Sequence, residues 1–158
     1  MGMAVHSLKT VQCIPAPLKT VWNFFSDPSN LQTITPASLK FKVISKHHGD
    51  HIYPGQIIEY RVKPVLGIPV YWMTEITHVK EGAFFVDEQR KGPYEFWHHQ
   101  HHFKEITGGV EMTDIVHYRS PGWILEPMID RLIVSPKLDN IFLFRLKVVE
   151  RLFGKWKE

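Results

Sequence analysis

One stretch near the middle of the chain, residues 92–103, constrains the fold most strongly; it reads Gly-Pro-Tyr-Glu-Phe-Trp-His-His-Gln-His-His-Phe. In a β-strand, successive side chains point to opposite faces of the sheet. One face of this strand therefore carries two histidines between two large aromatic residues: Trp97, His99, His101 and Phe103. The other face carries Phe96, His98, Gln100 and His102. The aromatic residues assign the first set to the interior, so we expect two histidines on a largely apolar inner surface.

The composition predicts one soluble domain, residues 1–158. Apolar residues make up 44% of the sequence and charged residues 22%, as is typical of globular proteins. The formal net charge is only +3 and the basic residues are scattered, so no nucleic-acid partner is expected.

The sequence also predicts a cytoplasmic protein that does not enter a membrane. Cys13 is the only cysteine, which fits a reducing compartment. No signal-peptide pattern is seen, and the longest nearly apolar run, residues 65–73, is interrupted by Gly67 and Pro69 and is too short to span a bilayer.

Hydrophobic periodicity and turn residues divide the chain into helices and strands. A strand at 6–14 precedes a helix at 16–25, and Asp27 followed by Pro28 predicts the start of a second short helix. Strands are then expected at residues 39–46, 56–62, 70–79, 83–90, 92–103 and 110–118, the spacing of an antiparallel meander. A short helix at 126–134 leads into a long one, with Ser135 as its N-cap and Pro136 in its first turn. Its buried stripe is predicted to be Leu138, Ile141, Phe142, Val148, Val149, Leu152, Phe153 and Trp156.

This order of elements resembles the START/polyketide-cyclase/birch-pollen-allergen superfamily (SRPBCC). The resemblance covers almost the whole chain and is carried by Val-Trp-Asn-Phe-Phe-Ser-Asp-Pro at 21–28 and by residues 30–31, 34–36, 85–89, 92–103, 112–114 and 142–145. Within the superfamily, the chain is similar to the small domains akin to the one fused to sugar-nucleotide-epimerase-like proteins, some of which are labelled cell-division inhibitors.

The resemblance implies an α+β helix-grip fold, in which a curved antiparallel sheet wraps around the long C-terminal helix and two short helices follow the first strand. It also implies a single START-like domain with a cavity between sheet and helix that binds a hydrophobic or amphipathic small molecule. It implies no catalytic residue, because the superfamily mixes carriers, sensors and a few enzymes.

Helical and strand spacing together predict a polar cluster inside the protein. Arg145 falls in the middle of the apolar helix stripe, where an unpaired charge would be very costly. Asp114 lies on an otherwise apolar strand face, and Asp87 lies on the face of a neighbouring strand. We therefore expect these three residues to meet His99 and His101.

Four roles for this cluster remain open from the sequence. Three of these roles are a structural ion pair with hydrogen-bonded histidines, an anchor for the polar end of a ligand, and an acid–base pair for catalysis. A metal site formed by His99, His101 and Asp114 is the fourth, and the sequence does not favour it.

The favoured prediction is a binding protein that is not an enzyme and has no cofactor or metal. Its partner is a hydrophobic or amphipathic small molecule, and the chain is a monomer or a homodimer. The expected ligand-binding residues are Tyr60, Trp72, Asp87, Trp97, His99, His101, Phe103, Asp114, Tyr118, Phe142 and Arg145.

Two alternatives belong to other classes of function. One is a cyclase- or hydrolase-like enzyme that uses His99 or His101 with Asp114, although the sequence indicates no nucleophile beside them. The other is a protein-interaction module that exposes the apolar loop at 65–70 and the Pro121-Gly122-Trp123 segment.

Overall fold

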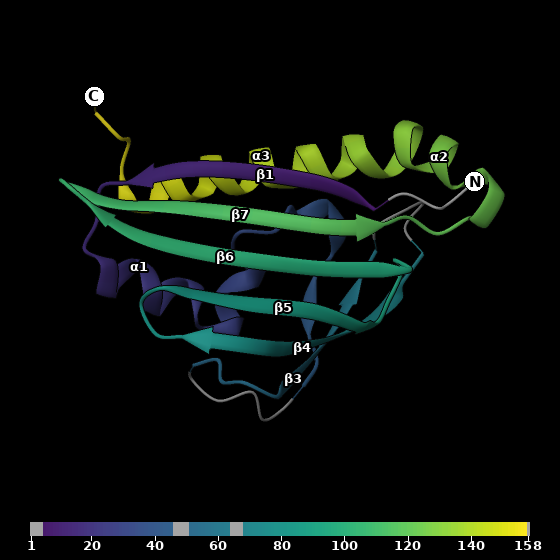
Figure 1. Ribbon diagram of the computed structural model, residues 1–158, viewed down its shortest axis with the longest axis horizontal. Coiled ribbons are helices and arrows are strands. Elements are labelled where there is room, and N and C mark those ends of the chain that lie inside the picture. Colours follow the sequence, from purple (N-terminus) through teal and green to yellow (C-terminus); the bar gives the residue numbers. More distant parts are fainter. Residues whose placement is uncertain (1–4, 46–50, 64–67, 158) are drawn as a thin grey trace.

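A curved sheet of seven antiparallel strands carries the fold of the computed structural model, which describes residues 5–45, 51–63 and 68–157 (Figure 1). The strands are β1 (His6–Ile14), β2 (Lys42–Val43), β3 (Gln56–Val62), β4 (Val70–Lys80), β5 (Phe84–Lys91), β6 (Phe96–Ile106) and β7 (Gly109–Arg119). Their order across the sheet is β1-β7-β6-β5-β4-β3-β2. The first strand thus pairs with the last, and β6 is an interior strand between β7 and β5.

The long helix α3 (Ser135–Phe153) runs alongside β1 and β7 in Figure 1. Gln12 of β1 ties the two elements together, because its Nε2 donates to the backbone oxygen of Leu146 over 2.9 Å. The short helix α1 (Leu18–Phe25) and the 3₁₀ turns η1 (Pro28–Gln32) and η2 (Ala37–Leu39) follow β1. Strand order, helix order and the α+β class all match the predicted helix-grip fold.

Alternating burial shows which sheet face is inside. On β3 the buried apolar residues are Ile58, Tyr60 and Val62, as their spacing predicts. On β6 and β7 each second residue is buried over most of the strand, so the histidine strand faces inward as expected. Trp22 of α1 packs edge-on against Phe85 of β5 and Phe103 of β6, so α1 covers the core beside these two residues.

The strand predicted at 39–46 is wrong in most of its length. Residues 37–39 form a 3₁₀ turn, and Lys40 ends that turn in a left-handed conformation with φ of 44°, which no strand continues. Of the described part of this stretch, residues 39–45, Lys42 and Val43 form the short strand β2 that pairs with β3. The predicted turn at 47–50 and most of the apolar loop at 64–69 lie outside the described residues.

The N-cap predicted at Ser135 is also wrong. The chain is already helical before this residue, through η3 (Trp123–Leu125), α2 (Glu126–Ile129) and the π-helical turn η4 (Asp130–Val134). The backbone N–H of Ser135 therefore bonds to the carbonyl of Asp130 and needs no side-chain cap. The π turn stands directly before Pro136, whose ring and missing N–H interrupt the α-helical ladder.

The end of the apolar stripe also differs from its prediction. The buried residues of α3 are Leu138, Phe142, Arg145, Val148 and Val149, whereas Leu152 is exposed. The helix ends at Phe153, and Gly154 follows with φ of 101°, so Trp156 lies beyond the helix. Among the described residues, no helix has the length and apolar character needed to cross a lipid bilayer.

We expect Gly109→Ala to destabilise the protein by about 2 kcal/mol, because it forces two strands apart. A Cβ at Gly109 would lie 2.0 Å from the backbone oxygen of Ile14, where the end of β1 meets the start of β7. Backbone atoms cannot move aside as a flexible side chain does. The free energy of unfolding, measured by urea titration, checks this, with Thr107→Ala in the same exposed turn as control. Equal stability of the two variants would contradict the expectation.

Candidate functional site

A pocket of about 170 Å³ lies between the inner face of the sheet and α3. Side chains from α1, η1, β3, β4, β5, β6 and α3 line it, and most of them are apolar. A cavity needs about 10–15 Å³ to hold one water molecule, so the pocket is roughly ten times larger. Its position between the sheet and the helix is the one that the sequence resemblance implies.

Eight of the predicted ligand-binding residues line this pocket. They are Tyr60, Trp72, Asp87, Trp97, His99, His101, Phe142 and Arg145. The three others lie outside the lining: Phe103 packs in the core against Trp22 and Phe25, Tyr118 stacks beside His6, and Asp114 lies on β7. A direct contact between a pocket ligand and these three residues is therefore not supported.

The sequence prediction missed the part of the lining that comes from the N-terminal helices. Phe24, Phe25, Leu31 and Ile34 come from the region of the two short helices predicted after the first strand, and they border the pocket. Their helical spacing identified the buried side but not what it covers, because a buried apolar side chain packs equally well against a core or a cavity. Tyr94 was missed too, because the strand predicted at 92–103 begins only at Phe96, so strand alternation does not hold at Tyr94.

Strand register brings the polar cluster together. His99 on β6 lies directly opposite Asp87 on β5, and His101 lies directly opposite Asp114 on β7. Because all four side chains point inward, the diagonal neighbours also meet. The result is a closed ring in which each histidine contacts both aspartates.

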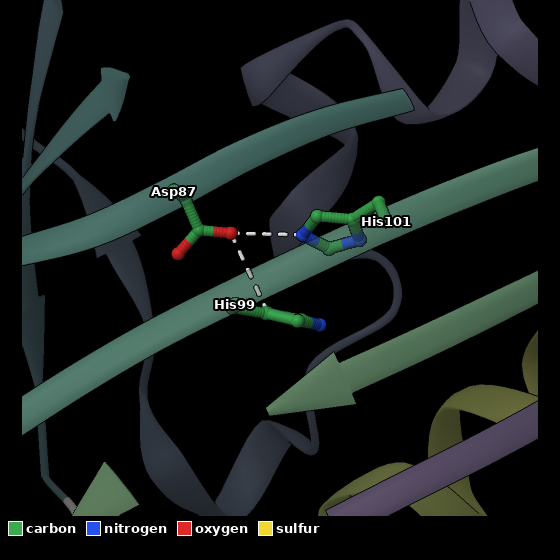
Figure 2. Close-up of side chains that lie close together, drawn as sticks. All are labelled: Asp87, His99 and His101. Carbon is green, nitrogen blue, oxygen red and sulfur yellow. Dashed lines mark hydrogen bonds and ion pairs between the residues drawn. The ribbon is translucent and has the colours of Figure 1, made fainter. Parts of the chain in front are cut away.

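The four contacts of this ring are short. His101 Nε2 donates to Asp87 Oδ2 over 2.8 Å, and His99 Nδ1 lies 3.4 Å from the same oxygen (Figure 2). On the other side, His99 Nε2 donates to Asp114 Oδ1 over 2.9 Å. His101 Nδ1 also lies 2.9 Å from Asp114 Oδ1, but at an angle too poor for a hydrogen bond.

Arg145 adds the positive charge that the sequence predicted. Its Nη1 lies 3.6 Å from Asp114 Oδ1, and its guanidinium group stands 4.8 Å over the ring of Phe142. Arg145 is only 7% exposed and Asp114 only 5%. The five predicted side chains thus form one buried cluster, on the side of the sheet that faces α3.

The ring sets different protonation states for its two histidines. Burial lowers the pKa of His101, but the contacts with Asp114 and Asp87 outweigh it and raise the pKa above its ordinary value. Burial and the neighbouring charge of His101 lower the pKa of His99. Burial raises the pKa of Asp114, yet its close contacts with His101 and His99 and the charge of Arg145 hold that pKa well below its usual range.

These directions favour charged Asp87 and Asp114 and a protonated His101 beside a neutral His99. In that state the two carboxylates balance Arg145 and His101, and the cluster has no net charge. Because an unbalanced buried charge is strongly unfavourable, this balance makes the cluster compatible with its depth in the protein.

Three N–H groups beside the pocket have no hydrogen-bond partner among the described residues. They are Nε and Nη1 of Arg145 and Nε1 of Trp72, and both residues line the pocket. A buried donor without an acceptor costs about 1–3 kcal/mol, and more where it carries charge. Arg145 and Trp72 thus combine an unsatisfied donor with a position beside the pocket, and a small side-chain movement would bring these donors to an acceptor from outside the chain.

A second polar cluster, which sequence reasoning missed, joins β1 to the helices before α3. His6 Nε2 lies 2.7 Å from Glu126 Oε1, and His6 Nδ1 lies 3.5 Å from Asp130 Oδ2. Ser120 Oγ donates to Asp130 Oδ1 over 2.7 Å. Both carboxylates are buried. No local spacing predicts this cluster, because His6 and Glu126 are 120 residues apart.

Comparison with known proteins identifies a family and a fold. The model of the family "Polyketide cyclase / dehydrase and lipid transport" matches residues 14–135. A comparison with curated proteins found no match.

Solved structures share the fold over nearly their whole length. Protein TTHA0849 from Thermus thermophilus is similar with a TM-score of 0.70 at 18% identity, over 92% of this chain and 95% of that chain. Protein Ms6760 from Mycobacterium smegmatis gives 0.67 at 19% identity, over 94% and 95%. The ginseng major latex-like protein 151 from Panax ginseng gives 0.69 at 14% identity, over 96% and 99%. At these identities the likeness concerns the fold alone.

Proposed function

Because the chain belongs to the polyketide cyclase / dehydrase and lipid transport family, we propose that it binds a small, largely apolar molecule that carries an acidic oxygen group. The observation that carries this proposal is Arg145, a buried cation beside an apolar pocket, with two nitrogen atoms that have no hydrogen-bond partner in the described part of the chain. The family supports binding of a small hydrophobic ligand, and Arg145 supports an acidic group at one end of that ligand.

The size of the pocket supports an occupant. At about 170 Å³ it has room for a small organic molecule rather than for one or two waters alone. Since most of the walls are apolar, water would find few partners there, and an apolar ligand is the occupant that such walls favour.

The chemistry of arginine favours an acid over a neutral acceptor. Its planar guanidinium group donates parallel hydrogen bonds to a carboxylate, and charge-assisted bonds of this kind are about twice as strong as neutral ones. Trp72 Nε1 supplies one more donor at the same pocket. A carboxylate or an acidic enol on an aromatic or alicyclic skeleton has the required shape and charge.

Titration with 2-naphthoate and with its methyl ester should separate the two parts of this proposal, namely binding in an apolar pocket and pairing of an acidic group with Arg145. We expect the acid to bind about 100-fold more tightly than the ester, a difference near 2.7 kcal/mol, because only the acid pairs with Arg145. Quenching of tryptophan fluorescence measures both affinities, since Trp72 and Trp97 line the pocket. Arg145→Lys should reduce the preference for the acid, while Arg151→Lys, an exposed position on the same helix, should leave it unchanged.

Two results would contradict the proposal. Equal affinity for acid and ester would remove the role of Arg145. Absence of binding of both, in protein shown to be free of a carried ligand by native mass spectrometry, would remove the pocket as a binding site for molecules of this size.

The enzyme alternative is a second candidate because both imidazoles line the pocket and neither is walled off from it. A His99 or His101 that moves protons with Asp114 behind it is a familiar acid–base arrangement. The interaction-module alternative is supported at one of its two segments, because Trp123 is 71% exposed. Part of its other segment, residues 65–67, lies outside the described part of the chain. Both alternatives remain predictions.

We further propose a single domain, a cytoplasmic location and a monomer or homodimer, as the composition indicates. We also propose the branch akin to the domain fused to sugar-nucleotide-epimerase-like proteins. The sequence motifs at 21–28 and 92–103 support this finer assignment.

A further inference from the structure

Three ligand-type atoms of the ring converge on one point beside the pocket. Asp87, His99 and His101 each offer one such atom, and these atoms all lie within 4.8 Å of one another. Asp87 Oδ2 contacts His99 Nδ1 and His101 Nε2. Figure 2 shows both imidazoles turned toward the same carboxylate oxygen. Each of the three residues also lines the pocket. The set is therefore both internal and adjacent to open space.

The opposite nitrogens of the two imidazoles face a different carboxylate. His99 Nε2 and His101 Nδ1 each lie 2.9 Å from Asp114 Oδ1. Imidazoles that bind metals usually donate their remaining N–H to such an acceptor, which fixes the tautomer and orients the ring. Asp114, on the strand across the histidines from Asp87, already accepts from His99 Nε2 and lies within reach of His101 Nδ1, which needs only a small rotation to donate to it.

The separations lie close to those between the ligands of a metal ion. Zinc–nitrogen and zinc–oxygen bonds of about 2.0–2.2 Å place neighbouring ligand atoms about 2.9–3.5 Å apart, from octahedral to tetrahedral geometry. The separation from Asp87 Oδ2 to His99 Nδ1 is 3.4 Å, within this range, and that to His101 Nε2 is 2.8 Å, the length of the present hydrogen bond, so a bound ion requires only a small widening there. Two imidazoles and one carboxylate suit the divalent first-row transition metals.

We propose that Asp87, His99 and His101 bind a divalent transition-metal ion of the zinc type, with Asp114 as the positioning residue behind both histidines. The sequence alone suggested Asp114 as the third ligand, and the structure assigns that place to Asp87. In the metal-free protein, a hydrogen bond joins His101 Nε2 to Asp87 Oδ2. A bound ion would replace the proton of this hydrogen bond, which is released to solvent. A bound ion would leave coordination positions for water or for a ligand in the adjoining pocket.

Cobalt titration of the whole, chelator-treated chain tests the site directly. Co²⁺ bound to nitrogen and oxygen ligands gives a visible absorption band, and equilibrium dialysis with Zn²⁺ gives the stoichiometry. We expect one tight site per chain, with the band lost in Asp87→Asn and in His99→Ala. Asp114→Asn should keep the single site but weaken it about 10–100-fold.

Two control variants exclude other histidines of this histidine-rich chain. His98→Ala removes the neighbouring imidazole on the outer face of β6, which pairs with Glu88 at 2.7 Å. His6→Ala removes the imidazole of the second cluster with Glu126 and Asp130. Both should bind Co²⁺ as the unaltered chain does. Circular dichroism and the urea midpoint confirm that each variant is folded before its titration is compared.

Three results would overturn the metal site: no band or stoichiometric binding in the unaltered chain, unchanged binding in Asp87→Asn and His99→Ala, or equal loss in His98→Ala. The metal titration contains no organic ligand, and naphthoate binding is measured in the presence of chelator. The metal site and the ligand pocket can therefore fail separately.

Discussion

Asp114→Ala should lower the free energy of unfolding by about 4 kcal/mol, the effect expected when one partner of a buried charge network is removed. Asp114 Oδ1 contacts His99 and His101 at 2.9 Å and Arg145 at 3.6 Å. Without it, Arg145 and a protonated His101 stand in an apolar interior with Asp87 as the remaining carboxylate of the cluster. Urea unfolding measures the loss.

The control for this prediction is Asp139→Ala, which removes an exposed carboxylate of α3 and should change stability by less than about 0.5 kcal/mol. Asp114→Asn keeps the shape and one acceptor oxygen, so its loss should fall between those of the two alanine variants. A loss below about 1 kcal/mol for Asp114→Ala would mean that the histidines and Arg145 can discharge or reach water without it. The neutral-cluster description would then be wrong.

The sheet was predictable because its information is local. In β3, β6 and β7 each inward residue is apolar or belongs to the cluster over most of the strand, and a period of two follows from strand geometry alone. The strand at 39–46 failed because Lys40 adopts a left-handed conformation, which depends on the turn around it and leaves no periodic trace. The start of α3 failed because Ser135-Pro136 has the appearance of a helix start, although the chain before it is already helical.

The polar cluster was predictable for the same reason as the sheet. Strand alternation gave the direction of His99, His101 and Asp114, and helical phase gave that of Arg145. What alternation cannot give is register between strands, so the sequence did not decide which aspartate faces which nitrogen. The structure resolves this through the pairs His99–Asp87 and His101–Asp114.

The role of the residues predicted to bind ligand could be judged only with distances. Trp97 and Phe103 share one face of β6 and look equivalent in the sequence. However, Trp97 borders the pocket, whereas Phe103 is enclosed by Trp22, Phe25 and Phe85. The difference arises because α1 packs on the sheet beside Phe103 and not beside Trp97. The position of α1 is a property of the whole fold.

Arg145→Ala should cost about 3 kcal/mol, near the lower end of the range for breaking a buried ion pair. The lower end is expected because Asp114 keeps its two histidine contacts, and because Nη1 is already 3.6 Å away and without a hydrogen bond. Part of the loss comes from packing, since the guanidinium group covers the ring of Phe142. Lys147→Ala, an exposed cation on the same helix, is the control for loss of charge at the surface.

The double variant Asp114→Ala, Arg145→Ala decides how closely the two charges depend on each other. If they form one network, its loss should be smaller than the sum of the single losses by about 1–3 kcal/mol, because removing both leaves neither charge unpaired. Urea titration of the four proteins gives this coupling. Additive losses would contradict the network. They would mean that Asp114 is stabilised by its histidines alone, and that the charge of Arg145 is left for a group from outside the chain.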